Sequence, residues 1–188
     1  QSMRNMLENG LWYEIADREG LIIVCPESTL HPMVNELSKN ETFAYRPLWS
    51  VLDPERKYTE VTYCEELLDR VIAELPVDTK RIYITGHSMG CMLTHYLGTS
   101  TVSRRFAALA VTSGVLRSRD QAAKWPLAAF VTNGQFDLWD YRLSEQSEVT
   151  AQIDMWLIHN GLATDENVWE IRTTGASEQY TEGVYNNT

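Results

Sequence analysis

The stretch RIYITGHSMGCMLTHYL, residues 81–97, decides the fold prediction for this chain. It opens with a β-branched, apolar run, RIYIT (81–85), which is typical of a buried strand, and continues as an apolar helical segment at 88–98. Between them stands GHSMG (86–90), a G-x-S-x-G pattern. A serine at such a strand-to-helix turn is typical of a nucleophile elbow, where a strained backbone holds the hydroxyl clear of the turn.

The residues around Ser88 each have a predicted role in this elbow. We expect the strand and the helix to approach too closely for side chains at Gly86 and Gly90. The amide of Met89, at the start of the helix, is the predicted oxyanion donor, because a helix N-terminus presents free N–H groups and a positive dipole end. The alternative interpretation is that Ser88 is an ordinary helix N-cap.

Strands and helices alternate along the rest of the chain. Strands are predicted at 20–26, 81–85, 106–114, 127–134 and 167–173, and helices at 2–18, 60–75, 88–98 and 144–161. This alternation predicts an α/β fold with a mostly parallel sheet and helices on both faces. Ligand sites in such sheets lie at the carboxyl ends of the strands. Residues 27–59, which mix aromatic residues with prolines, are predicted to form a long loop on the substrate side.

The acid partner of the serine is expected after a later strand. Asp137 comes just past the apolar strand at 127–133, so it should lie at the same sheet edge as Ser88. Asp140 is close by and is the alternative acid. An aspartate that merely stabilises a turn is the other interpretation of Asp137.

Composition limits the classes of partner. The chain has 188 residues, 44% of them hydrophobic, and a net charge of −10, which argues against nucleic acid or an anionic membrane as the main partner. No apolar run approaches the roughly 18 residues of a membrane span, and no ligand spacing such as HExxH suggests a metal or cofactor. The three cysteines, Cys25, Cys64 and Cys91, are expected to be free thiols, with one disulfide as the alternative.

Three segments together resemble a known family. VDTKRIYITGHSMG (77–90), FAALAVTSG (106–114) and AAFVTNGQFD (128–137) resemble the polyhydroxybutyrate-depolymerase-like esterases, α/β-hydrolases that include feruloyl and acetylxylan esterases. GLIIVCPES (20–28) is similar to the strand that precedes the substrate loop of that family. The resemblance runs over about residues 12–160.

The resemblance implies hydrolysis of carboxylic esters through an acyl-enzyme on Ser88, with Asp137 orienting a histidine. It also favours secretion, for which the sequence carries no other indication. This chain departs from the family at Met89 and Cys91, where small residues are frequent, and at LWDY after Asp137.

The histidine that such a triad needs is not evident. Only His159 follows Asp137, and it falls at the far end of the predicted helix, roughly 20 Å from the catalytic edge, so we expect it to be a helix C-terminal cation. His95 is expected to pack two turns down the elbow helix.

The substrate site is predicted to include His31, Trp49 and His87. His31 follows the predicted strand at 20–26, which places it at the catalytic edge. Its use as a substitute base is a further alternative, although this would break the order Ser, acid, His.

These observations predict that residues 1–188 are a single, partial α/β-hydrolase domain, lacking the first strands and the C-terminal histidine segment. The triad histidine is expected beyond Thr188, and this stretch alone is predicted to have little or no activity. The cut sheet edge would need the remainder of the polypeptide, or another chain, as a cover. Alternative functions are a non-catalytic binding or structural module and a serine peptidase of the prolyl-oligopeptidase type.

Overall fold

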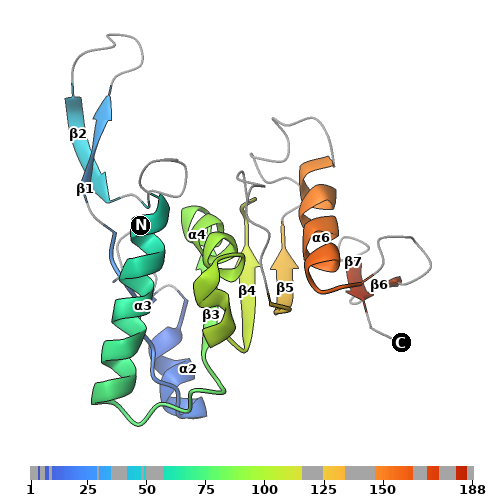
Figure 1. The fold of residues 1–188 in the computed structure, drawn as a ribbon. Coiled ribbons are helices and arrows are strands. Elements are labelled where there is room, and N and C mark those ends of the chain that lie inside the picture. The colour runs from blue at the N-terminus through green and yellow to red at the C-terminus, as the bar shows by residue number, and fades with distance from the viewer. Residues whose placement is uncertain are drawn as a thin grey trace. The chain divides into compact units, whose positions relative to one another are not determined.

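The computed structural model contains two compact units, Gln1–Asp78 and Thr79–Thr188 (Figure 1). The structure describes residues 4, 7–8, 10–28, 30–34, 42–47, 49, 57–115, 125–133, 147–162, 169–173 and 181–185. No helix among these residues is both long and apolar enough to span a bilayer.

The first unit contains two main helices and an antiparallel hairpin. Its elements are α2 (Trp12–Glu19), β1 (Leu30–Val34), β2 (Thr42–Pro47) and α3 (Lys57–Glu74). Helix α3 confirms the helix predicted at 60–75, and its residues Val61 and Cys64 are buried, as the apolar stripe requires. Helix α2 ends at Gly20, which adopts a left-handed φ of 65°.

The strand predicted at 20–26 is wrong. Residues 21–28 form no regular structure, and Leu21, Ile22 and Val24 are 45–46% exposed. A strand requires a neighbour for its backbone N–H and C=O groups, and no described strand pairs with this segment. The predicted long loop at 27–59 is also corrected, because it contains the β1–β2 hairpin.

The second unit is built on a three-stranded parallel sheet. Its order is β3 (Tyr83–His87), β4 (Ala108–Thr112) and β5 (Ala128–Thr132). The unit also contains three helical elements: α4 (Met89–Gly98), the 3₁₀ helix η2 (Thr101–Arg105) and α6 (Ser147–His159). The prediction of an α/β arrangement with parallel strands is confirmed for this sheet.

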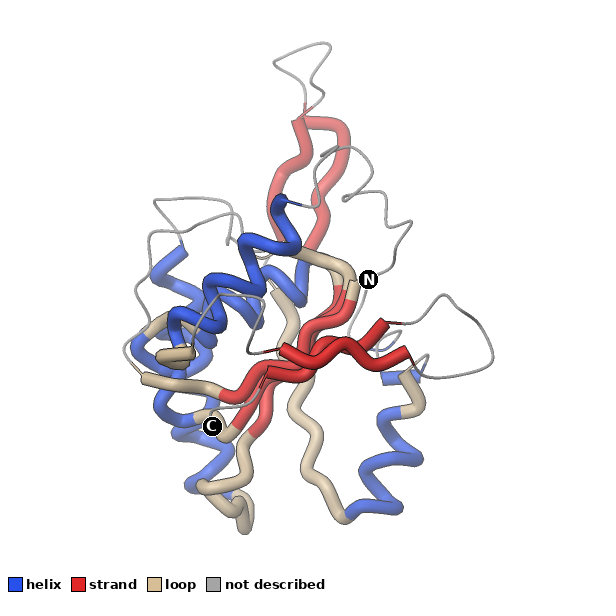
Figure 2. The backbone as a smooth tube through the Cα atoms, turned by 90° about the vertical axis from the view of Figure 1, so that its right-hand side faces the viewer, coloured by secondary structure: helices blue, strands red, loops and turns tan. Residues whose placement is uncertain are grey.

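The core of the second unit lies around α4. Every residue from Cys91 to Gly98 is buried, as expected for a helix that is apolar on all sides. A Cβ on Gly98 would lie 2.6 Å from Leu109 of β4 and 3.0 Å from Trp156 of α6, so both helices pack on the same face of the sheet (Figure 2). The sequence predicted helices on both faces of the sheet. In the described part of this unit, the two α-helices lie on the same face.

The last strands form a separate hairpin. Strand β6 (Trp169–Thr173) pairs antiparallel with β7 (Thr181–Tyr185), with Trp169 opposite Tyr185. A strand was expected at 167–173, but as a further member of the parallel sheet. Strand β7 was not predicted, because its sequence TEGVY combines a central glycine with few apolar residues.

Candidate active site

Ser88 stands at the turn between β3 and α4 in a strained backbone conformation. Its φ is 55° and its ψ is −118°, a region that residues with a side chain rarely occupy. The Ser88 N–H donates a hydrogen bond of 3.2 Å to the carbonyl of Thr112, while its own carbonyl accepts one of 3.2 Å from Met92. Ser88 is therefore hydrogen-bonded to the sheet through its N–H and to helix α4 through its carbonyl group.

The crowding predicted for the elbow glycines is present at one of them. Gly86 is buried, and a Cβ at this position would overlap the backbone carbonyl of Gly90. The prediction for Gly90 is wrong, since a Cβ there would meet nothing within 4 Å. The close approach lies between the Gly86 Cα and the first turn of α4, so only the strand position requires glycine.

Gly114 supports the elbow from the neighbouring strand and was missed by the sequence analysis. A Cβ on Gly114 would lie 2.8 Å from the carbonyl oxygen of Ser88 and 3.0 Å from the Cys91 side chain. The end of β4 therefore reaches the elbow as closely as van der Waals contact allows. The available signal was the small pair Ser113-Gly114 at the end of an apolar strand.

Polar groups gather where the three parallel strands end. His87, Thr112 and Thr132 are in register across β3, β4 and β5. Beyond them, the Ser113 N–H donates to the carbonyl of Thr132 at 3.0 Å, and the Gly114 N–H donates to the Asn133 side-chain oxygen at 3.3 Å. This edge is the place at which ligand sites of parallel sheets form.

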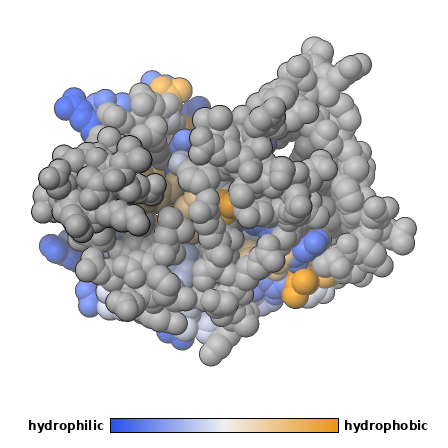
Figure 3. All heavy atoms as spheres, turned by 90° about the horizontal axis from the view of Figure 1, so that it is seen from above, coloured by the Kyte–Doolittle hydropathy of each residue, from blue (hydrophilic) through white to orange (hydrophobic). Residues whose placement is uncertain are grey.

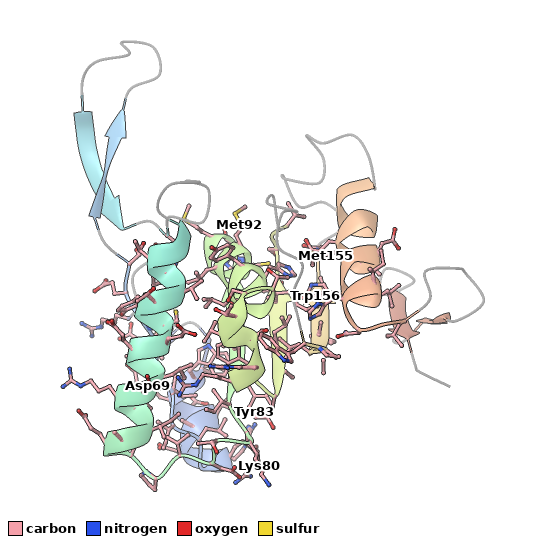
Figure 4. The ribbon with its side chains drawn as sticks, in the orientation of Figure 1. Asp69, Lys80, Tyr83, Met92, Met155 and Trp156 are labelled. Carbon is pink, nitrogen blue, oxygen red and sulfur yellow. The ribbon has the colours of Figure 1, made fainter. Side chains whose placement is uncertain are left out.

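His95 is a structural residue, as the sequence predicted. It is fully buried in α4, and Trp156 of α6 donates a hydrogen bond of 3.1 Å to its Nδ1. Figure 4 shows the Trp156 side chain between α6 and α4. Because the indole N–H can only donate, the neutral ring carries its proton on Nε2, which lies 2.7 Å from the side-chain amide nitrogen of Gln152. Two N–H groups cannot face each other, so the Gln152 amide is assigned the flipped orientation, in which its oxygen accepts the hydrogen bond from His95. Burial lowers the pKa of His95 to about 4.

His159 lies at the opposite edge of the sheet from Ser88, which confirms the distance argument. The next residue, Asn160, accepts a hydrogen bond of 2.8 Å from the Leu127 N–H and donates one of 3.0 Å to the Leu127 carbonyl. Since Leu127 immediately precedes β5, the end of α6 is attached to the amino end of that strand. The His159 ring stacks edge-on against Trp156, with centroids 5.2 Å apart.

The other predicted site residues lie in different surroundings. His87 is exposed beside Ser88. His31 lies in β1 opposite Arg46, and the strand at 20–26 that was to place it at the catalytic edge is not formed. Asp137 and the alternative acid Asp140 lie outside the described residues.

Trp49 belongs to the first unit and is half-buried. Its ring lies against Tyr63 of α3, with centroids 6.4 Å apart and planes inclined by 36°. The sequence analysis did not single out Tyr63. Its spacing from Thr59 and Glu66, one turn before and one turn after it on the helix, was the available signal.

All three cysteines are free thiols, as predicted, and the disulfide alternative is wrong. Burial, helped by the charge of Glu60, raises the pKa of Cys64 to about 12. The pKa of Cys25 is raised by burial and by Glu27. Within the described ranges, no group of three His, Cys, Asp or Glu side chains could hold a metal ion.

Comparison with known proteins relates the chain to an esterase. It is similar to the bifunctional acetylxylan esterase/xylanase XynS20E of Neocallimastix patriciarum, with 26% identity over 129 residues. The match covers 69% of this chain, which spans only 16% of the length of that relative. No family model matches the chain, and no solved structure matches it.

Proposed function

We propose that this chain belongs to a serine hydrolase of carboxylic esters, with Ser88 as the nucleophile. The observation that carries the proposal is the positive φ of Ser88 between a parallel strand and a buried helix. Such strain is retained where the surrounding structure enforces it, and Gly86 and Gly114 provide the space for it here. The similarity to an acetylxylan esterase/xylanase supports the same class of reaction.

The proposed reaction proceeds through an acyl-enzyme. The Ser88 hydroxyl loses its proton to a general base as its oxygen attacks the ester carbonyl, and the oxyanion of the tetrahedral intermediate accepts a hydrogen bond from the Met89 amide. The alcohol departs with the proton, and water then attacks the acyl-enzyme in the same way to release the acid. Asp137 orients the base by accepting a hydrogen bond from its imidazole N–H.

The base is assigned to a histidine outside these 188 residues. His95 is fully buried between Gln152 and Trp156, and His159 lies at the opposite edge of the sheet. His87 is exposed and adjoins Ser88 in the chain, and we expect its side chain to point away from the serine. His31 precedes the nucleophile and would break the order Ser, acid, His.

The proposed substrates are short acyl esters of xylan or a related plant polysaccharide. This choice follows the name of the similar protein, an acetylxylan esterase/xylanase. Feruloyl esters are the second substrate class to be measured, because the sequence resemblance extends to feruloyl esterases. Release of acetate and of ferulate from the same xylan preparation separates the two.

The test is covalent labelling with a fluorophosphonate on the longest natural polypeptide that contains this chain. We expect the label on the peptide that carries Ser88 and its loss in Ser88→Ala. The matched control is Ser103→Ala, since Ser103 is buried in η2 and its hydroxyl has no hydrogen-bond partner among the described residues. An unlabelled Ser88 in a folded wild-type protein would overturn the proposal in favour of a non-catalytic binding module.

A further inference from the structure

One face of α3 carries a shallow open depression whose lining residues have no assigned role in the proposed esterase reaction. Thr59, Thr62, Tyr63 and Glu66 line it, and its volume is about 340 Å³. These four residues follow the spacing i, i+3, i+4, i+7, so they form a single stripe on the helix. The side chains of Val61 and Cys64 are buried on the other side.

Tyr63 exposes an aromatic surface in this depression. It is 39% exposed, which leaves much of a large apolar ring in contact with water. Trp49 packs against it from a segment outside the helix, with the two ring planes inclined by 36°. This contact restrains the Tyr63 ring, so the ring presents a preoriented flat surface to a ligand.

The groups around Tyr63 are suited to a neutral polyol. The Glu66 carboxylate, which can accept hydrogen bonds from hydroxyl groups, lies one turn after Tyr63, and the threonines Thr59 and Thr62 complete the lining. The apolar ring is therefore surrounded by polar side chains. A pyranose offers the complementary surface, with C–H bonds on its ring face and hydroxyls at its rim. The carboxylate and the net charge of −10 disfavour an anionic ligand.

We propose that this depression on α3 binds one neutral pyranose unit of a polysaccharide chain, with Tyr63 as the stacking platform and Glu66 as the hydroxyl acceptor. The proposal deepens the proposed function and rests on it for the choice of xylan as the polysaccharide. It assigns a saccharide contact to the first unit, whereas Ser88 belongs to the second.

Xylohexaose binding tests this proposal on the same natural polypeptide in its Ser88→Ala form. Titration calorimetry should show binding that weakens at least tenfold in Tyr63→Ala and in Thr62→Arg, since the arginine side chain fills the depression. Glu66→Gln should weaken binding several-fold by removing the charged acceptor. The matched controls are Tyr13→Ala and Thr101→Arg, which make the same changes at exposed positions of α2 and η2 and should leave affinity unchanged.

The Thr62→Arg variant is expected to remain folded, because Thr62 is exposed on the helix and arginine is a good helix former. Weaker binding by this variant would therefore not result from unfolding. Absence of xylohexaose binding at millimolar concentration would overturn the proposal. So would equal affinity in wild-type and Thr62→Arg proteins with the same circular dichroism spectrum. Because the binding assay uses the Ser88→Ala form, its result is independent of whether Ser88 is labelled by a fluorophosphonate.

Discussion

At the scale of single residues, the elbow depends on two missing side chains from different strands. Gly86 leaves room for the Gly90 carbonyl, and Gly114 leaves room for the Ser88 carbonyl and Cys91. The positive φ of Ser88 lowers the stability of the folded state by an amount of order 1–3 kcal/mol. The cost is met by the packing of α4, which is buried from Cys91 to Gly98.

Substitution of the two elbow glycines should have opposite effects. Gly86→Ala should lower the free energy of unfolding by about 3 kcal/mol or more, because the new methyl group overlaps the Gly90 backbone. Gly90→Ala is the matched control and should be neutral or raise stability by up to about 1 kcal/mol, since its Cβ meets open space in a helix. Urea denaturation of both variants measures the difference, and equal stabilities would contradict this description of the elbow.

At the scale of elements, a buried polar cluster joins α4 to α6. His95, Gln152 and Trp156 satisfy one another at distances of 2.7 and 3.1 Å inside the core. Helix α6 follows Asp137 in the sequence, and α4 follows Ser88. The cluster therefore packs the helix after the predicted acid against the helix after the predicted nucleophile. A protonated His95 could not accept the hydrogen bond from Trp156.

The low pKa of His95 makes stability depend on pH. The folded state holds the ring neutral down to about pH 4, whereas an unfolded histidine takes up its proton near pH 6.5. The unfolded state therefore binds more protons between these values, so this contribution is fully present above pH 6.5 and is lost as the pH falls toward 4. Between pH 7 and pH 5 the loss should be about 2 kcal/mol.

Urea denaturation of wild type and His95→Gln at pH 7, 6 and 5 measures this contribution. The wild type should lose about 2 kcal/mol more than the variant over this interval, because the glutamine does not titrate. His87→Asn is the matched control, as it removes an exposed histidine and should keep the wild-type slope. The same pH slope in wild type and His95→Gln would show that His95 is not held neutral by the fold.

At the scale of the whole molecule, large apolar side chains are exposed in both units. Exposed large side chains occur in the segment after α2 and at both outer strands of the sheet, including Leu21, Tyr83 and Phe130. On the face seen from above in Figure 3, the hydrophobic atoms of described residues that are visible form small groups. The net charge of −10 opposes association of these groups at neutral pH.

The three thiols should report the integrity of both units. Cys91 is fully buried in the second unit, and Cys64, whose pKa is raised to about 12, is buried in the first. With an aromatic disulfide reagent at pH 8, we expect slow reaction of Cys25 alone in the native protein and of all three thiols in denaturant. Cys25→Ser should abolish the native reaction. More than one equivalent reacting without denaturant would contradict the burial of Cys64 and Cys91.

The sequence alone determined the strand, serine turn and helix at residues 81–98, the long helix α3 and the positions of the parallel strands. These features depend on local periodicity and on backbone preferences that neighbouring residues express. The role of Gly86 could be predicted for the same reason, since it follows from the turn itself.

Only the tertiary structure decided which apolar segments pair and which glycines are required. The run at 21–25 has a strand composition but no described partner, and Gly114 is constrained by a turn 26 residues earlier in the chain. The His95 cluster likewise joins residues 57 and 61 positions apart. Strand pairing and core packing depend on contacts between residues that are distant in the sequence. Local composition and periodicity therefore do not predict these contacts.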